Sequence, residues 1–358
     1  MVKKVHVLVG AVILLVAVGL SFSLLYLTQS NSNEQKLKLQ GANMTLIFTG
    51  DVMMGPKVET VLAAGQNVFE DLEPTFERSD LVVINLEAPF TNSTDNWKQL
   101  IPLKADPQYA YLLKDNHINV ANIANNHIMD YGPTGLYETI GILKADNISY
   151  MGAGENLDKA SQPAYFNVSN KTIAIVSFYD NVTFTYYAPE EIQSATNTRP
   201  GYAPASWDVV KKSIDTAKNN SDFVIVCFHY GNEYEQTHDQ YQENLSRKSI
   251  DEGADLVIGN HAHITQDVEL YKGKLIFYSL GNCVFYDLSA GSPNSIIVEI
   301  KVVNGTAQAI IHPIHIIDCT PYLMDNESAQ SFLESIKAKS SANIKIEKGM
   351  GIIDMGQL

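Results

Sequence analysis

Short apolar runs alternate with amphipathic segments along most of the chain. The runs are rich in β-branched residues and nearly all apolar, which is typical of strands that are covered on both faces. The predicted strands are residues 44–49, 81–84, 120–124, 172–178, 223–228, 256–258 and 275–278. Helices are predicted between them at residues 58–64, 106–115, 135–145, 205–218 and 240–252. Strands that alternate with helices in this way predict an α/β fold.

The pattern changes towards the C-terminus. Residues 295–303 and 306–317 alternate polar and apolar positions around Asn304-Gly305, the dipeptide that type I′ hairpin turns prefer. We expect this hairpin to extend a sheet and not to form a new domain. A last helix is predicted at residues 328–337.

The N-terminus carries an almost unbroken apolar run from about Val5 to Leu27, long enough to cross a bilayer as one helix. Lys3 and Lys4 precede the run and few charges follow it, which predicts a cytoplasmic N-terminus and an external body. A cleaved signal peptide is the alternative, although its apolar core is usually shorter and no Ala-x-Ala site follows the run. We therefore expect a single-pass protein of the cell membrane with an extracellular catalytic domain. The predicted divisions are an anchor (1–27), a linker (28–42), one large domain (43–319) and a helical and extended C-terminal extension that packs on the core (320–358).

Composition narrows the classes of partner. A formal net charge of −15 argues against a nucleic-acid partner, because phosphate binding needs clustered Lys and Arg. The 3 cysteines are too few and too scattered for a disulfide framework. Asn-x-Ser/Thr sequons recur, and they indicate either a glycosylated external face or simple asparagine richness. The sequon asparagines are Asn43, Asn92, Asn147, Asn167, Asn170, Asn181, Asn219, Asn244, Asn304 and Asn326.

Polar side chains follow the predicted strands at their carboxyl ends, where open α/β sheets place their chemistry. A two-metal phosphoesterase needs a bridging carboxylate together with neutral nitrogen or amide-oxygen ligands. The residues of these types that follow apolar strands are Asp51, Glu87, Asn126, His229, His261 and His263. We therefore predict a divalent-metal site. His127 directly follows one ligand, so we expect it beside the metals as the catalytic residue that stabilises charge or protonates the leaving oxygen.

These motifs resemble those of the calcineurin-like metallophosphoesterase superfamily. The short motifs are Gly50-Asp51, Asn126-His127, His229 and Gly259-Asn260-His261-Ala262-His263. The longer strings at residues 49–55, 85–89, 124–132 and 278–282 are similar to the capsule-synthesis branch, the CapA or PgsA type linked to poly-gamma-glutamate. The likeness covers about residues 44–285.

The resemblance implies a four-layer αββα sandwich of two mixed sheets, with two divalent ions at the strand ends. Asp51, Glu87 and His263 would hold one ion. The other would be held by Glu87, which bridges the two, and by Asn126, His229 and His261.

The chain departs from the superfamily pattern at two positions. Met53 stands where an Asp-x-His motif has its His, and Glu87 replaces the usual bridging Asp. The missing imidazole leaves the first ion with fewer protein ligands, so we expect either weak binding or a water molecule in the gap. The thioether of Met53 is a poor substitute, because hard divalent ions prefer other ligands. The oxygen-rich ligand set favours Mn, Mg or Fe, and the histidines also accept Zn.

Four further residues are candidates for supporting roles. Asp130 is expected to brace the loop after His127. Glu233 is expected either to orient His229 or to face the substrate, and Lys104 and Asn282 are candidates for lining the cleft.

The function that the resemblance implies is a part in the biosynthesis of a capsule or another cell-surface polymer. We expect a divalent-metal-dependent phosphoester hydrolase that acts at the membrane on a phosphoester or a surface polymer. The alternative is a non-catalytic metal-binding subunit of a polymer synthesis or export complex, favoured by Met53 and by the absence of phosphate from an amide polymer. Cleavage of the polymer's own peptide or sugar linkages is a third possibility. No arrangement of Ser or Cys nucleophiles supports a metal-free route.

Overall fold

A computed structural model describes residues 39–97, 101–180, 193–286 and 292–358. The predicted anchor at 1–27 and most of the predicted linker lie outside these residues. Within the described ranges, no helix has the length and apolarity needed to cross a membrane.

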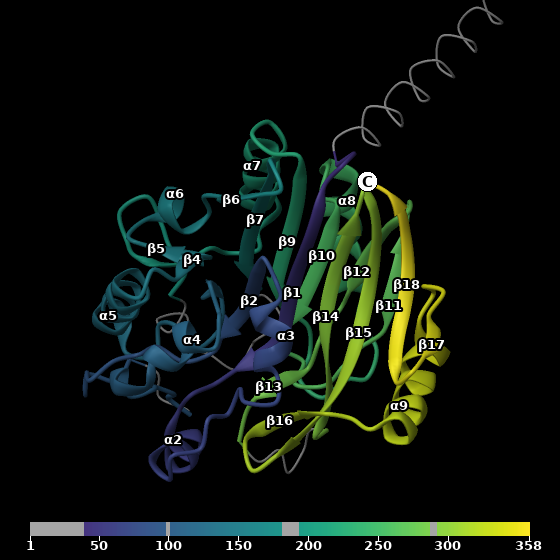
Figure 1. Ribbon diagram of the computed structural model, residues 1–358. Helices are drawn as coiled ribbons and strands as arrows, with labels where there is room; N and C mark the ends of the chain where they lie inside the picture. The colour runs from purple at the N-terminus through teal and green to yellow at the C-terminus, as the bar shows by residue number, and fades with distance from the viewer. Residues whose placement is uncertain (1–38, 98–100, 181–192, 287–291) are drawn as a thin grey trace, which may run out of the picture.

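Two large sheets form the body of the protein (Figure 1). The 10-stranded sheet has the order β17-β18-β15-β14-β1-β2-β3-β4, with β13 paired to β1 and β16 paired to β15. Its strands are β1 (Asn43–Val52), β2 (Leu81–Leu86), β3 (Val120–Asn122), β4 (Ser149–Met151), β13 (Asn282–Val284), β14 (Asn294–Val303), β15 (Thr306–Ile317), β16 (Thr320–Leu323), β17 (Lys345–Glu347) and β18 (Met350–Gln357). Strands β1 to β4 pair in parallel, whereas β14 runs antiparallel to β1, so the sheet is mixed.

The 6-stranded sheet has the order β11-β12-β10-β9-β7-β6. Its strands are β6 (Ala164–Val168), β7 (Lys171–Tyr179), β9 (Phe223–His229), β10 (Leu256–Asn260), β11 (Val268–Tyr271) and β12 (Lys274–Phe277). The inner pairs are parallel and both edge strands are antiparallel, so this sheet is also mixed. A separate small sheet pairs β5 (Ala153–Gly154) with β8 (Gly201–Tyr202).

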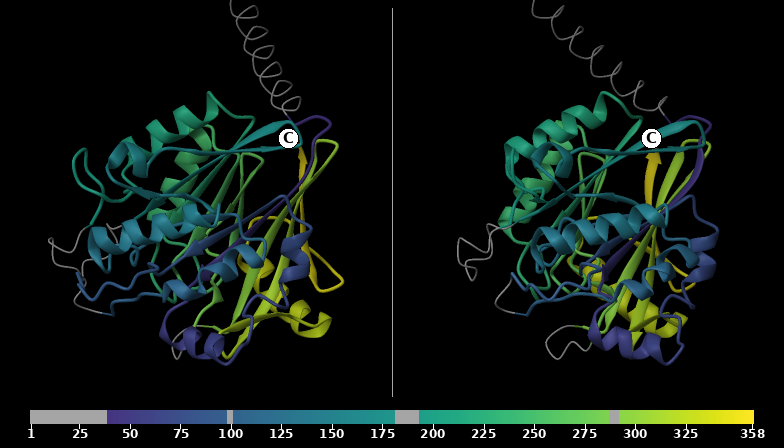
Figure 2. Two further views of the ribbon diagram at one scale, coloured as in Figure 1. Left: turned by 60° about the vertical axis from the view of Figure 1, so that its left-hand side comes forward. Right: turned by 90° about the vertical axis from the view of Figure 1, so that its left-hand side faces the viewer.

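Most helices cover the outer faces of the two sheets. The helical elements are α2 (Pro56–Ala63), α3 (Glu73–Glu77), η1 (Pro107–Tyr109), α4 (Tyr111–Asp115), α5 (Gly132–Ala145), α6 (Leu157–Ala160), α7 (Trp207–Lys218), α8 (Gln240–Glu252) and α9 (Asn326–Lys339). Helices α7 and α8 pack on the 6-stranded sheet. Helices α2 to α5 share a buried apolar cluster with the outer face of β1, β2 and β3. Helix α9 instead packs against edge strands of both sheets and adds Leu333 and Ile336 to the cluster between them. The two views in Figure 2 show the helices around the sheets.

Alternating side chains explain why the sheets stack. Phe48 of β1 and Ile225 of β9 belong to one buried cluster between the sheets. Their neighbours point the other way: Ile47 joins the cluster beneath α2 to α5, and Val224 joins the cluster beneath α7 and α8. Because successive side chains of a strand point to opposite faces, each apolar strand supplies two layers of core at once. The expected sandwich of two mixed sheets in an α/β fold is confirmed.

Most of the predicted elements form, with boundaries that shift by a few residues. The hairpin at Asn304-Gly305 is confirmed, and it extends the 10-stranded sheet through the pairing of β14 with β1. The predicted helix at 106–115 was wrong in its first part, which is the short 3-10 turn η1. The Asp106 side chain accepts a hydrogen bond from the backbone of Gln108, and this cap tightens the first turn before α4 begins.

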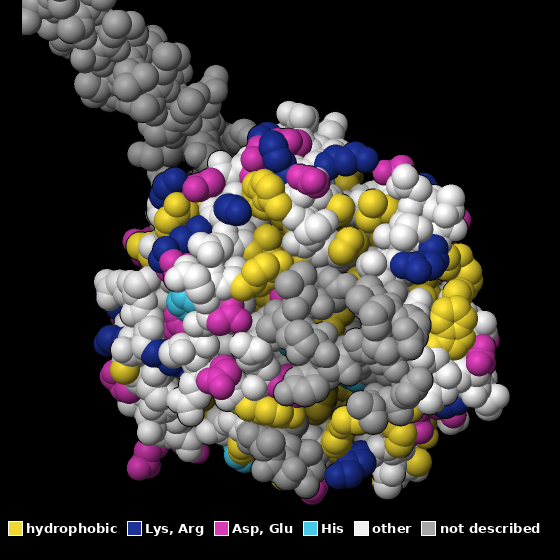
Figure 3. All heavy atoms as spheres, turned by 180° about the vertical axis from the view of Figure 1, so that it is seen from behind, with side chains coloured by type: hydrophobic (Ala, Val, Ile, Leu, Met, Phe, Trp, Pro, Cys, Tyr) yellow, Lys and Arg dark blue, Asp and Glu magenta, His cyan; other side chains and the backbone are white. Residues whose placement is uncertain are grey.

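Figure 3 shows the face opposite to that of Figure 1. On it, the described Lys and Arg side chains are scattered among Asp and Glu, with apolar side chains between them. A mixed surface of this kind is usual where a protein meets water. Each sequon asparagine that the structure describes is exposed, so burial does not exclude glycosylation, which stays a prediction.

Candidate metal centre

The carboxyl ends of strands from both sheets meet at one place. Asp51 lies near the end of β1 and Glu87 directly follows β2, and the parallel register brings the two strand ends side by side. His229 ends β9 of the other sheet, and His261 follows β10. The side chains of these four residues are completely buried. The fold therefore collects two carboxylates and two imidazoles inside the sandwich.

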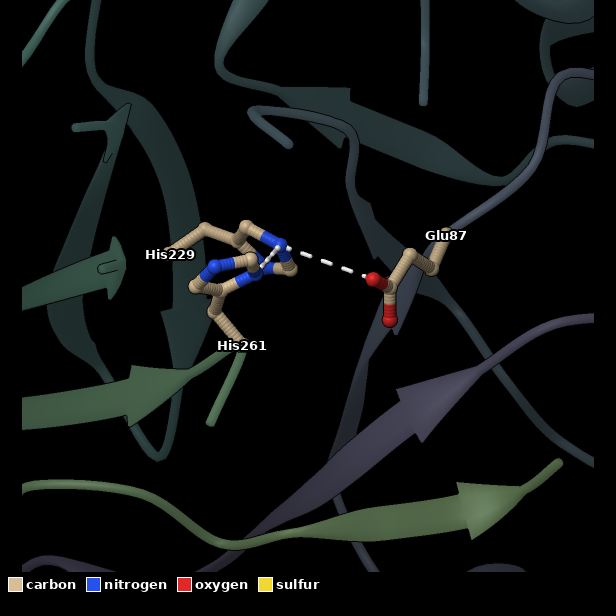
Figure 4. Close-up of side chains that lie close together, drawn as sticks. All are labelled: Glu87, His229 and His261. Atoms are coloured by element: carbon tan, nitrogen blue, oxygen red, sulfur yellow. Dashed lines mark hydrogen bonds and ion pairs between the residues drawn. The ribbon is translucent and has the colours of Figure 1, made fainter. Parts of the chain in front are cut away.

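Glu87 lies in the middle of this group. Its Oε1 atom lies 3.6 Å from Nε2 of His229 and 3.8 Å from Nε2 of His263. Figure 4 shows the rings of His229 and His261 close together, facing the Glu87 carboxylate. Neither carboxylate oxygen of Glu87 has a hydrogen-bond partner among the described residues. Burial raises the pKa of Glu87 well above its ordinary value, and the neighbouring Asp51 carboxylate raises it further.

The donor atoms form two groups that share Glu87. One group is Asp51, Glu87 and His263, and the other is Glu87, His229 and His261. The ligand atoms within each group lie within 4.8 Å of one another. Buried charged groups are costly unless they are paired or coordinate a metal. The shared carboxylate, which accepts no hydrogen bond from the described residues, and the mixed oxygen and nitrogen donors therefore fit a pair of divalent ions.

Asn126 adds an amide to the second group. Its Oδ1 atom lies 2.9 Å from Nε2 of His229, and Nδ1 of His261 lies 3.0 Å from the same nitrogen. An amide oxygen and two imidazoles converge on one point beside Glu87. The structure thus brings together all six of the predicted metal ligands in the two arrangements that the resemblance implies. Their role as ligands stays a prediction.

His263 is fixed from two sides. Its Nδ1 atom lies 3.0 Å from Oδ1 of Asn282 and 3.3 Å from Oδ2 of Asp51. Burial lowers the pKa of His263, but the charges of Glu87 and Asp51 outweigh it and raise the pKa to about 10. Both His261 (φ 97°) and His263 (φ 56°) have left-handed backbone conformations, which are strained for residues other than Gly. Strain of this kind persists where the surrounding structure holds it, often at functional sites.

Asn282 holds this histidine at both its ring and its backbone, because Nδ2 of Asn282 also donates to the carbonyl oxygen of His263 at 3.1 Å. We expect Asn282→Ala to weaken ion binding at the His263 group by about 10- to 100-fold, the usual effect of losing a residue that orients a ligand. Calorimetric titration with Mn²⁺ would measure this. Unchanged affinity for both ions would show that Asp51 alone orients the ring.

His127 is held by Asp130. Nδ1 of His127 lies 2.7 Å from Oδ2 of Asp130, and the same carboxylate accepts a hydrogen bond from the backbone of Leu103 at 2.7 Å. The backbone nitrogen of His127 donates to the side chain of Asn125. The predicted contact of Asp130 with the loop after Asn126 is therefore present, and it is made to the ring of His127.

The other predicted residues lie in different surroundings. Nζ of Lys104 donates to the carbonyl oxygen of Ser93 at 2.7 Å and lies 5.0 Å from the centre of the Tyr131 ring. None of these partners is a metal-ligand candidate, so a place for Lys104 in the cleft stays a prediction. Glu233 is exposed. One of its carboxylate oxygens and one ring nitrogen each of His261 and His263 lie within 4.8 Å of one another.

Met53 does not offer its sulfur to the centre. The side chain is buried, and its Sδ atom accepts a hydrogen bond from the backbone nitrogen of Gly55 at 3.0 Å. The backbone nitrogen of Met53 donates a hydrogen bond to the carbonyl oxygen of Val284. The sulfur is thus occupied by the turn that leads into α2.

Sequence reasoning missed the role of Asn85. Its Nδ2 atom donates to Oδ1 of Asp51 at 2.8 Å and lies 3.3 Å from Nδ1 of His229, so one amide contacts candidate ligands from both sheets. Its Oδ1 atom accepts hydrogen bonds from the side-chain amides of Asn122 and Asn125. The sequence does contain a signal for this role. Asn85 lies two positions before Glu87, and alternate residues of a strand share a face, so the two side chains point to the same side.

Comparisons with known proteins agree with the motifs. The profile of the family described as "Bacterial capsule synthesis protein PGA_cap" matches residues 45–287. The "PGA biosynthesis protein CapA" of Bacillus subtilis is 34% identical over 317 residues, which cover 86% of this chain and 81% of that protein. The "Capsule biosynthesis protein CapA" of Bacillus anthracis is 33% identical over 293 residues, covering 79% of this chain and 70% of that protein.

Among solved structures, the calcineurin-like phosphoesterase YfkN from Bacillus subtilis matches with a TM-score of 0.39 and 12% identity. The match covers 79% of this chain and 89% of the YfkN chain. A likeness this distant adds nothing to the chemistry derived from the side chains.

Proposed function

The chain belongs to the bacterial capsule synthesis protein family PGA_cap, and from this premise we propose that it is a divalent-metal-dependent phosphoester hydrolase of capsule or cell-surface polymer biosynthesis. The polymer that its relatives suggest is poly-gamma-glutamate. We also propose that residues 1–27 anchor the chain in the cell membrane with the metal centre outside.

The single observation that carries the proposal is the Glu87 carboxylate. It is fully buried, it has no hydrogen-bond partner among the described residues, and it belongs to two separate ligand groups. A purely structural buried carboxylate would accept hydrogen bonds, because a buried polar group without them is unfavourable. A position shared between two cations would account for both its burial and its place in the two groups.

The protein's own residues have separable tasks in this proposal. Divalent ions at such a centre supply Lewis acidity, activate water and orient a phosphoryl group. Asp51 and Glu87 would hold the ions with negative charge, and the histidines and Asn126 would complete the sites. Asp130 engages Nδ1 of His127, so Nε2 is the ring nitrogen that would pass a proton to the leaving oxygen.

The test is metal-dependent cleavage by the full-length protein. After treatment with a chelator, the purified chain is assayed with bis-p-nitrophenyl phosphate, with and without added Mn²⁺. We expect Mn²⁺ to raise the rate of p-nitrophenol release by at least about tenfold, because Lewis acidity contributes several kcal/mol to such reactions. Chelated protein that is as active as the Mn²⁺-loaded protein would sink the proposal.

A second candidate is a metal-binding subunit of a polymer synthesis or export complex that has no hydrolytic activity. It is favoured by Met53, whose sulfur bonds the backbone of Gly55, so the group of Asp51, Glu87 and His263 receives no donor from this position. Protein that binds two Mn²⁺ ions, cleaves no phosphoester and co-purifies with membrane synthesis subunits would decide for this candidate.

A further inference from the structure

The two ligand groups of the proposed centre are unequal. Glu87, Asn126, His229 and His261 offer four protein donors to one ion. Asp51, Glu87 and His263 offer only three to the other. Divalent cations in proteins take at least four ligands, and six is usual for the hard ions. The group that contains His263 therefore has one protein donor fewer than the group that contains His229.

Glu233 lies beside both histidines of the His261-Ala262-His263 loop. One of its carboxylate oxygens and one ring nitrogen each of His261 and His263 all lie within 4.8 Å of one another. Glu233 is exposed whereas the other ligand carboxylates are buried, so it approaches the centre from the solvent side.

The loop that carries Glu233 is fastened to the histidine loop. The backbone nitrogen of Tyr234 donates to the carbonyl oxygen of Ala262 at 2.8 Å, between the two histidines. The Tyr234 ring lies 6.0 Å from that of His263, centre to centre. Tyr234 has a left-handed backbone (φ 65°), which is uncommon for an aromatic residue and is held here by these contacts.

The far end of the loop is fixed as well. The side-chain nitrogen of Gln266 donates to the carbonyl oxygens of Glu235 and Thr237, at 3.0 and 3.2 Å. Gly231 begins the loop with φ 88°, and a Cβ atom there would lie 2.5 Å from the side chain of Gln242. The position of Glu233 beside His263 is therefore built into the fold.

We propose that the Glu233 carboxylate is a ligand of the ion held by Asp51, Glu87 and His263, and that it supplies the fourth protein donor. This inference rests on the metal centre of the proposed function and goes beyond it by completing one of its two sites. The completed site has three carboxylates and one imidazole. Such a set favours Mn²⁺ or Mg²⁺ over Zn²⁺ at this position.

The experiment compares two alanine variants of the full-length protein in titrations with Mn²⁺ alone. Glu233→Ala removes the proposed ligand. Glu235→Ala removes the same charge from an exposed position two residues away and serves as the matched control. Isothermal titration calorimetry gives the number and affinity of the sites, and electron paramagnetic resonance reports the magnetic coupling of a Mn²⁺ pair.

We expect Glu233→Ala to weaken one of the two sites at least about tenfold and to remove the coupled signal at limiting Mn²⁺, while Glu235→Ala behaves as the wild type. Two unchanged sites in Glu233→Ala would overturn the inference and leave the proposed function intact. A wild-type protein that binds no Mn²⁺ would overturn both.

Two double variants identify the ion that Glu233 binds. Combining Glu233→Ala with His229→Ala is expected to weaken both sites, because each change removes a ligand of a different ion. Combining Glu233→Ala with His263→Ala is expected to leave one site at wild-type affinity. The reverse pattern would contradict the assignment of Glu233 to the His263 ion.

Discussion

Glu87→Gln is expected to abolish the binding of the ion pair and to lower phosphoester cleavage by on the order of a thousandfold, since the bridging charge serves both ions and several kcal/mol of Lewis-acid stabilisation are lost with them. The substitution keeps the size of the side chain and removes its charge. Calorimetry and the rate of p-nitrophenol release measure the two effects.

Thermal unfolding provides an independent measurement of the same variant. Wild-type protein at an ion concentration 100 times the dissociation constant is expected to gain about 2.7 kcal/mol of stability for each bound ion, and the variant is expected to gain none. Without ions, Glu87→Gln is expected to be about as stable as the wild type, because glutamine has the shape of the neutral carboxyl that the raised pKa of Glu87 favours. A variant that is much less stable without ions, and still binds two of them, would show that Glu87 is structural.

His127→Ala is expected to leave both ions bound and to lower kcat by about 100- to 10,000-fold, the range for losing a general acid or base. The ring contacts Asp130 and is not part of either ligand group. This separation of binding from turnover is the signature of a residue that acts on the substrate. Steady-state kinetics and Mn²⁺ titration of the same preparation measure it.

Asp130→Asn is the companion variant, because it retains His127 and removes the charge that orients its ring. We expect a smaller loss of kcat than in His127→Ala and a shifted pH profile, since a neutral partner stabilises the protonated imidazole less well. An unaltered kcat in His127→Ala would remove this residue from the proposed chemistry. The hydrolytic proposal would then need another proton donor.

The sequence predicted the position of the strand-end ligands because a simple rule governs them. Parallel strands end at one edge of a sheet, so Asp51 and Glu87 had to be neighbours once their strands were identified. The two histidines after β10 followed from the second sheet in the same way. What the apolar runs could not show was which strands from the two sheets would face each other.

Other features depend on contacts between residues far apart in the chain. Asn85 looks like an ordinary strand residue until the second sheet brings His229 beside it. The approach of Glu233 depends on a backbone hydrogen bond from Tyr234 to Ala262, which no local pattern encodes. Strand β18 was missed because its sequence contains two glycines and no long apolar run, and its partner β15 decides its conformation.

The first strand fixes how far the centre stands from the point where the chain enters the fold. The backbone nitrogen of Gly305 donates to the carbonyl oxygen of Ala42, and that of Leu358 donates to Gly305, so the start and the end of the domain lie together. Asp51 lies at the other end of β1, roughly 25 Å away at about 3.3 Å per residue. If residues 1–27 anchor the chain as proposed, the metal centre lies at the end of β1 that is farther from the anchor.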